Sequence, residues 1–76
     1  MKSKYAVIKT HHADREGERI GYGIAAVSSK RGYVEIRDLF SDLSTDADKV
    51  RRLVRLCNTQ SLDPIHLPDV VEDFLS

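Results

Sequence analysis

Three runs of β-favouring residues in the first half of the chain predict an antiparallel sheet. The runs cover residues 5–10, 19–28 and 33–40, and each is rich in apolar, aromatic or β-branched side chains. Polar segments that end in glycine separate them, at 14–17 and 29–32. Because short turns of this kind join consecutive antiparallel strands, the pattern predicts a three-stranded β-meander.

Apolar positions in the second half follow a helical period instead. A helix is expected over residues 46–59, opened by a capping-box pattern of Thr45 and Asp48. Its apolar stripe consists of Ala47, Val50, Leu53, Val54 and Cys57. A second, acidic helix begins at Pro64 or near Pro68, with the stripe Leu67, Val70, Val71, Phe74 and Leu75. We therefore predict an α+β fold in a single domain, residues 1–76: a three-stranded antiparallel β-meander followed by two helices packed on one face.

Alternation along the strands assigns a core face and an open face to this sheet. The core face, beneath the helices, is expected to hold Ala6, Ile8, Ile20, Tyr22, Ile24, Ala26, Val34 and Ile36. The open face carries a strip with almost no side chain along the second strand. We assign a candidate interaction surface to six residues of the open face: Tyr5, Val7, Gly21, Gly23, Ala25 and Tyr33.

Two interpretations of the open face follow from this composition. In the first, Tyr5 or Tyr33 lies across the glycines and covers the exposed backbone. In the second, the shallow strip accepts a second sheet, a peptide or another copy of the chain. A two-fold axis would suit a homodimer on this face, and strand addition at a sheet edge is a rival route to self-association.

Length and charge narrow the classes of function. A chain of 76 residues has room for one domain, which buries only about 60% of the surface that its unfolded chain exposes, so we expect modest stability. The 12 basic and 12 acidic residues cancel, so the net charge attracts neither nucleic acid nor an anionic membrane. The halves nevertheless differ, since 1–37 carry 8 basic and 4 acidic residues and 38–76 carry 4 basic and 8 acidic ones. Zero net charge gives little protection against self-association.

Candidate chemistry is sparse. The single Cys57 excludes an internal disulfide and occupies a core position of its helix, where a thiol is inert. His66 is better explained as a cap for the last helix than as a catalytic partner of Cys57. His11 and His12 point to opposite faces of a strand and cannot chelate one ion together. We predict no enzyme activity, no catalytic residue, no metal and no cofactor.

Basic residues on the first helix give a weak nucleic-acid pattern. Lys49, Arg51, Arg52 and Arg55 lie on its outer side, and the hairpin turn adds Lys30 and Arg31. The acidic residues of the last helix, Asp69, Glu72 and Asp73, are expected to lie beside these arginines and screen them. Since there is no platform of aromatic and basic residues either, the sequence disfavours nucleic acid as a partner.

Several short motifs resemble a known family. They are Tyr22-Gly23-Ile24, Ser44-Thr45 at a helix start, Leu56-Cys57-Asn58, and above all Pro64-Ile65-His66-Leu67 with the segment 69–75. Together they resemble a family of short proteins of unknown function from clostridia-type bacteria, over nearly the whole chain. The resemblance implies a cytoplasmic bacterial protein and brings no catalytic residue, cofactor or partner.

These observations lead to one main hypothesis and two others. The main hypothesis is a non-enzymatic protein-interaction or regulatory module whose partner is another protein or a second copy in a homodimer. The alternative is a small-molecule-binding domain that uses the strip at Gly21 and Gly23. An enzyme built on Cys57 and His66 is the least supported. With no secretion signal and no membrane span in the sequence, we expect a cytoplasmic protein.

Overall fold

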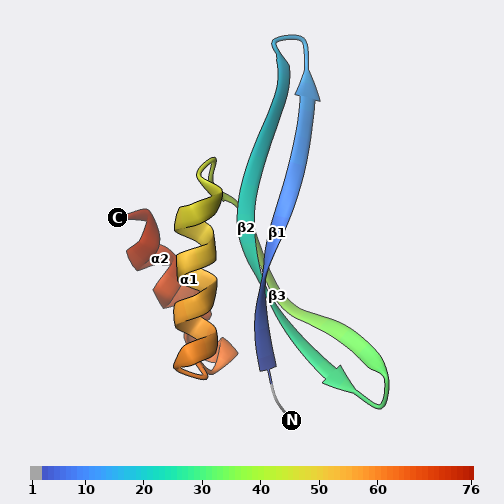
Figure 1. The fold of residues 1–76 in the computed structure, drawn as a ribbon, viewed down its shortest axis with the longest axis vertical. Helices are drawn as coiled ribbons and strands as arrows, with labels where there is room; N and C mark the ends of the chain where they lie inside the picture. Colours follow the sequence, from blue (N-terminus) through green and yellow to red (C-terminus); the bar gives the residue numbers. More distant parts are fainter. Residues whose placement is uncertain (1–2) are drawn as a thin grey trace.

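The sheet is the predicted three-stranded antiparallel meander, with strand order β1-β2-β3 (Figure 1). The computed structural model describes residues 3–76. Its strands are β1 (Ser3–Asp14), β2 (Gly17–Lys30) and β3 (Tyr33–Ser44), all longer than the sequence pattern predicted. At the second turn Arg31 and Gly32 both have positive φ values, 52° and 83°, as a two-residue type I′ hairpin turn requires.

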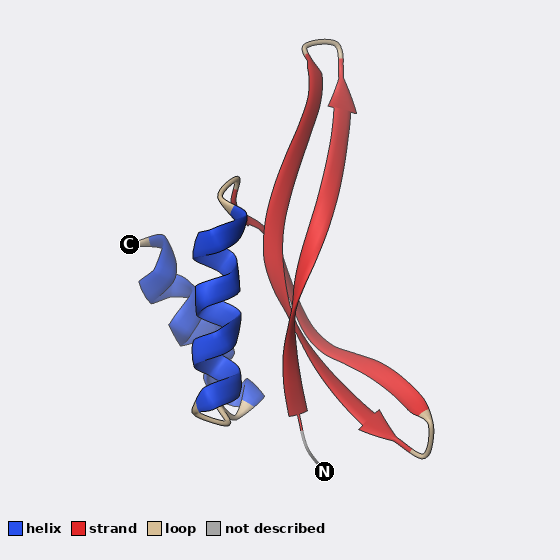
Figure 2. Ribbon diagram, in the orientation of Figure 1, coloured by secondary structure: helices blue, strands red, loops and turns tan. Residues whose placement is uncertain are grey.

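Three helical segments follow the sheet: α1 (Ala47–Thr59), η1 (Pro64–His66) and α2 (Leu67–Leu75). The cap of α1 is Asp46 and not Thr45, because the Asp46 carboxylate accepts hydrogen bonds from the backbone N–H groups of Asp48 and Lys49. Both predicted starts of the last helix exist, since Pro64 opens the short 3-10 turn and α2 follows it directly. Figure 2 shows both helices on one face of the sheet, which confirms the predicted fold.

The core lies between the sheet and this helical layer. It consists of Tyr5, Ile24, Ala26, Val50, Leu53, Val54, Cys57, Leu67 and Val71. Tyr5 anchors β1 to the helices, because its hydroxyl donates a 2.7 Å hydrogen bond to the carbonyl of Leu62. The Asn58 side chain completes the attachment: it accepts from the Tyr5 N–H at 2.8 Å and donates to the Tyr5 carbonyl at 3.0 Å. Asn58 therefore occupies the edge of β1 at this point as a neighbouring strand would.

The predicted core face is wrong for β1 and for the start of β3. Tyr5 pairs with Ala26 and Val7 with Ile24, and antiparallel partners point to the same side, so Tyr5 and Val7 face the helices. Ala6 is exposed and Ile8 only half-buried. Val34 and Ile36 are also exposed, because the two-residue turn pairs them with Ser29 and Val27, which lie on the face away from the helices. A one-residue difference in register moves every side chain of a strand to the other face.

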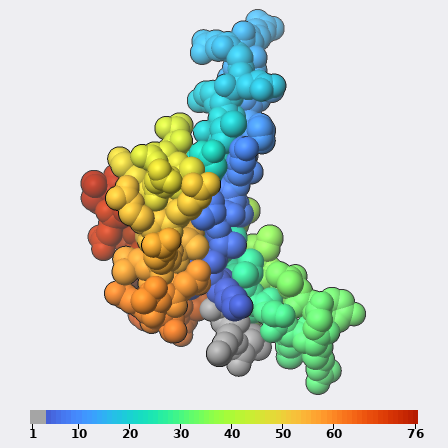
Figure 3. All heavy atoms as spheres, viewed as in Figure 1, coloured from blue at the N-terminus to red at the C-terminus, as the bar shows by residue number. Residues whose placement is uncertain are grey.

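Two hairpin arms stand clear of the body. Figure 3 shows one arm around the β1–β2 turn and a second around the β2–β3 turn. The molecule consequently measures 43 × 30 × 18 Å, an extended shape for so short a chain. In the second arm, residues 29–34 pair only with each other within the described chain. Val34, one of the exposed apolar side chains described next, lies on this arm.

Candidate interaction surface

An apolar patch covers the face of the sheet that points away from α1 and α2. Leu39 pairs with Ala25, and Ile36 pairs with Val27, so these side chains share one face across β2 and β3. On β1, Ala6 and Ile8 pair with Ala25 and Gly23 and extend the same face. We define the apolar patch as Ala6, Ile8, Val27, Val34, Ile36 and Leu39.

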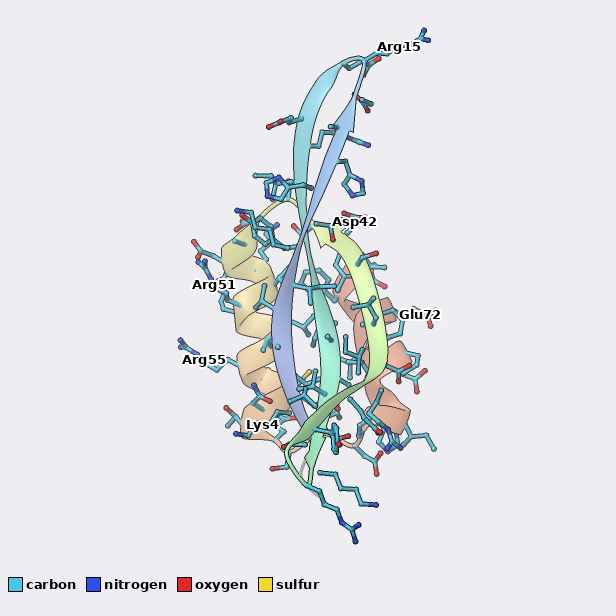
Figure 4. All side chains as sticks on the ribbon, turned by 90° about the vertical axis from the view of Figure 1, so that its right-hand side faces the viewer. Lys4, Arg15, Asp42, Arg51, Arg55 and Glu72 are labelled. Atoms are coloured by element: carbon cyan, nitrogen blue, oxygen red, sulfur yellow. The ribbon has the colours of Figure 1, made fainter. Side chains whose placement is uncertain are left out.

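The β3 side of this patch is open to solvent. Val34 is 71% exposed, Ile36 62% and Leu39 54%. In Figure 4 this face of the sheet lies in front, with both helices behind it. A contiguous group of large apolar side chains on a monomer typically marks an interaction site.

The six residues predicted from the sequence do not form one surface. Tyr5 is only 4% exposed and belongs to the core, and Val7 packs against that core on the helix side. Tyr33 is 74% exposed at the arm's turn, opposite Lys30, and as the neighbour of Val34 in β3 it points to the other face. The predicted surface is therefore wrong in three of its six residues, Tyr5, Val7 and Tyr33. The sheet does have an open face, but other side chains lie on it.

The glycine strip is filled by the chain itself. A Cβ atom on Gly23 would meet the carbonyl oxygen of Phe40 and would lie 2.8 Å from the Cα atom of Ser41. A Cβ atom on Gly21 would meet the carboxylate of Asp42. The bulged segment of β3 thus covers both glycines, and neither Tyr5 nor Tyr33 does so. The space above Gly21 and Gly23 is therefore occupied and does not form the open strip that the sequence predicted.

A side-chain bridge joins the two outer strands beside Gly21. The Nε2 atom of His12 lies 2.8 Å from Oδ1 of Asp42 and 2.9 Å from Oδ2. Arg19, Ile20, Ser44 and Thr45 complete the lining of a 310 Å³ hollow around this pair. Sequence reasoning missed the bridge because it ended the third strand at Phe40, which left Asp42 in a supposed link. Among residues 3–76, no group of three or more His, Cys, Asp or Glu side chains is arranged to hold a metal ion.

Cys57 and His66 lie in different surroundings. Cys57 is 2% exposed in the core, and burial raises the pKa of its thiol, which disfavours the reactive thiolate. His66 is exposed, and no hydrogen bond joins it to Cys57 within the described chain. His66 occupies the cap position of α2, yet its ring makes no capping hydrogen bond, so that predicted role is wrong.

A groove separates α1 from α2. Leu53, Leu56, Val70 and Phe74 form its apolar floor, and its volume is about 540 Å³. Lys49 and Arg52 border it on the α1 side and Asp73 on the α2 side.

The predicted screening of Arg51 and Arg55 by the acidic helix is not seen in the structure. Figure 4 shows Arg51 and Arg55 on the side of α1 that faces away from α2, with Glu72 on the opposite flank. In the part of the chain that the structure describes, no ion pair connects the two helices. Arg51 instead pairs with Asp48 of its own helix at 3.1 Å.

No helix within residues 3–76 is long and apolar enough to cross a membrane.

Comparison with known proteins places the chain in a family. Neither a curated protein nor a solved structure matches the chain. The family model described as "Family of unknown function (DUF6514)" matches residues 1–76. Because this match covers the whole chain, the protein belongs to the DUF6514 family.

Proposed function

We propose that the protein is a non-enzymatic interaction module that forms a homodimer through the apolar patch. The observation that supports this most strongly is the exposure of Val34, Ile36 and Leu39 side by side on β3, a strand at the edge of the sheet. Catalytic inactivity and a location in the bacterial cytoplasm remain predictions from the sequence.

The arm itself favours a partner. An isolated two-stranded hairpin is marginally stable in water and needs a third strand or a packed layer on one face. Residues 29–34 have neither within the described chain, although the arm keeps a regular register from Val27 to Lys30 against Ile36 to Tyr33. A partner that covers the apolar patch would supply the missing layer.

A second copy of the chain suits this surface for two reasons. The exposed side chains Val34, Ile36 and Leu39 are uncharged, and the net charge of zero gives no overall repulsion between copies. A two-fold axis near Ile36 would also place Val34 of one copy against Leu39 of the other and reciprocally, since one patch then serves both subunits.

The expected dimer is weak. Full burial of a Val, Leu or Ile side chain contributes about 1.5–3 kcal/mol, and partial burial of three such side chains per copy would give on the order of 6–12 kcal/mol. Loss of translational and rotational freedom costs roughly 4–15 kcal/mol. The largest surplus that these two ranges allow is about 8 kcal/mol, so we expect a dissociation constant that is micromolar or weaker.

Sedimentation velocity on two matched lysine variants tests the proposal. Ile36→Lys places a charge in the centre of the apolar patch, whereas Tyr33→Lys makes the same change in net charge on the other face of the same strand. We expect Ile36→Lys to be a folded monomer and Tyr33→Lys to dimerise like the native protein. Equal dimerisation of the native protein and Ile36→Lys would disprove the use of this patch.

Strand addition at the edge of β3 is the competing arrangement. The outer edge of β1 is occupied at Tyr5 by Asn58, whereas β3 is the other edge of the sheet. In a dimer built by strand addition, the β3 side chains would stay on the sheet faces and Ile36→Lys would have little effect. The variant therefore distinguishes the two arrangements.

A further inference from the structure

The groove between α1 and α2 carries opposite charges on its two sides. Lys49 and Arg52 are three residues apart on α1 and so lie on one side of that helix. Asp69 and Asp73 are four residues apart on α2 and form a similar acidic row. Within residues 3–76, none of these four side chains takes part in an ion pair.

The floor of the groove is apolar and partly open. Leu56 is half-exposed, and Val70 and Phe74 are only half-buried. Leu53 and Leu56 are spaced as i and i+3, and Val70 and Phe74 as i and i+4, so both walls present ridges with a helical repeat. A volume of about 540 Å³ leaves space for several apolar side chains of a partner.

We propose that this groove binds an amphipathic helix of another protein, with acidic residues along one edge of its apolar stripe and basic residues along the other. The acidic edge would lie against Lys49 and Arg52, and the basic edge against Asp73, with Asp69 one turn earlier on the same helix. An apolar stripe at positions i, i+4 and i+7 fits a floor built from two helices, as in other helix-in-groove complexes. The groove shares no residue with the apolar patch, so this site is independent of the proposed dimer.

Three stapled helical peptides labelled with fluorescein test the charge pattern by fluorescence anisotropy. All share leucines at i, i+4 and i+7; one has glutamates on one edge and lysines on the other, the second has lysines on both edges, and the third has glutamates on both. We expect the native protein to bind the mixed peptide about fivefold more tightly than either uniform one. Equal affinities, or no saturable binding of any peptide, would overturn the proposal.

A pair of charge-reversed variants shows whether the groove is responsible. Lys49→Glu/Arg52→Glu makes both sides of the groove acidic, and we expect the doubly basic peptide to become the best ligand while the mixed peptide loses about tenfold. Arg51→Glu/Arg55→Glu makes the same change in net charge on the side of α1 away from α2, and it should leave the order of affinities unchanged. A similar reordering in both variants would show general attraction instead of a groove.

The same peptide distinguishes a second copy of the chain as occupant. If the mixed peptide dissociated the native dimer, and the methyl resonances of Leu56 shifted on dilution, the groove would be a self-association surface and the proposal would be wrong. We expect peptide binding to leave the sedimentation of the native protein unchanged apart from the added mass.

Discussion

His12 of β1 and Asp42 of β3 form a hydrogen-bonded pair although β2 lies between their strands, with Nε2 2.8 Å from the nearer carboxylate oxygen. The carboxylate of Asp42 reaches the space directly above Gly21, where a larger residue would place its Cβ atom. Asp42 also has a positive φ of 57°, which aspartate tolerates better than most residues. The hydrogen bond between His12 and Asp42 thus depends on two features: the space left by the missing side chain of Gly21, and the backbone conformation of Asp42.

Gly21→Ala is expected to destabilise the protein by about 1–3 kcal/mol, because the added methyl group meets the Asp42 carboxylate. Urea denaturation measures the change in the free energy of unfolding. In an Asp42→Gly background the carboxylate is absent, so the same substitution should cost less than about 1 kcal/mol. Additive effects of the two substitutions would show that Gly21 and Asp42 are not coupled.

Gly23→Ala is expected to cost more than Gly21→Ala, because its Cβ atom would meet the backbone of Phe40 and Ser41, which cannot rotate away as a side chain can. We expect a loss of about 3 kcal/mol or more, measured by thermal or urea unfolding. Gly17→Ala cannot serve as a control for these substitutions, because Gly17 has a φ of 120°, a backbone conformation that alanine rarely adopts. Gly23→Ala with native stability would contradict the observed contact between β2 and the bulge of β3.

Asn58→Asp should weaken the attachment of β1 to the helices. The carboxylate can still accept from the Tyr5 N–H, but it cannot donate to the Tyr5 carbonyl, which then loses its partner. We expect a loss of about 1–3 kcal/mol and faster amide exchange at Tyr5. Gln60→Glu, at an exposed position nearby, is the control and should change stability by less than about 0.5 kcal/mol. Equal effects of both substitutions would indicate a general charge effect.

The free energy of unfolding is expected to fall in alkaline solution, because Cys57 and then Tyr5 lose their protons. Burial raises the pKa of the Cys57 thiol above its ordinary value of 9.0, and burial is also the largest cause of the raised pKa of Tyr5, ordinarily 10.0. Since the folded protein holds these protons more tightly than the unfolded chain, their contribution is complete below the ordinary values and is lost as pH rises through the raised ones.

Cys57→Ala separates the two contributions. At neutral pH it should cost on the order of 1 kcal/mol or more, because it leaves a cavity in the core. Urea unfolding at a series of pH values from neutral to alkaline should show a shallower decline around pH 9 for this variant. Parallel curves for the variant and the native protein would mean that the thiol does not titrate differently on unfolding. Thiol labelling of the native protein should correspondingly be slow.

The architecture was predictable because the three strands and two helices each carry a strong local pattern. The polar turns, the helical stripes from Val50 to Cys57 and from Leu67 to Val71, and the buried state of Cys57 all agree with the structure. Such signals depend on neighbouring residues in the sequence, and tertiary contacts here reinforce them.

The faces of the strands were not predictable, because their assignment depends on pairing between distant residues. Nothing in the run from Tyr5 to Ile8 indicates that Tyr5 pairs with Ala26, and its odd and even positions are similarly apolar. The bulges of β3 are equally long-range: they bring Asp42 over Gly21 and return Leu39 to the face that carries Ile36. The sequence therefore predicted correctly that one face of the sheet is open, but it did not predict which large side chains lie on that face.

The proposed dimer is tested most directly by intermolecular nuclear Overhauser effects in a mixture of ¹³C-labelled and unlabelled protein, recorded above the dissociation constant. We expect contacts between the methyl groups of Val34, Ile36 and Leu39 in different copies. Intermolecular contacts confined to the backbone amides of β3 would establish strand addition instead. If no intermolecular contact is seen at this high concentration and the protein also sediments as a monomer there, the homodimer would be contradicted altogether.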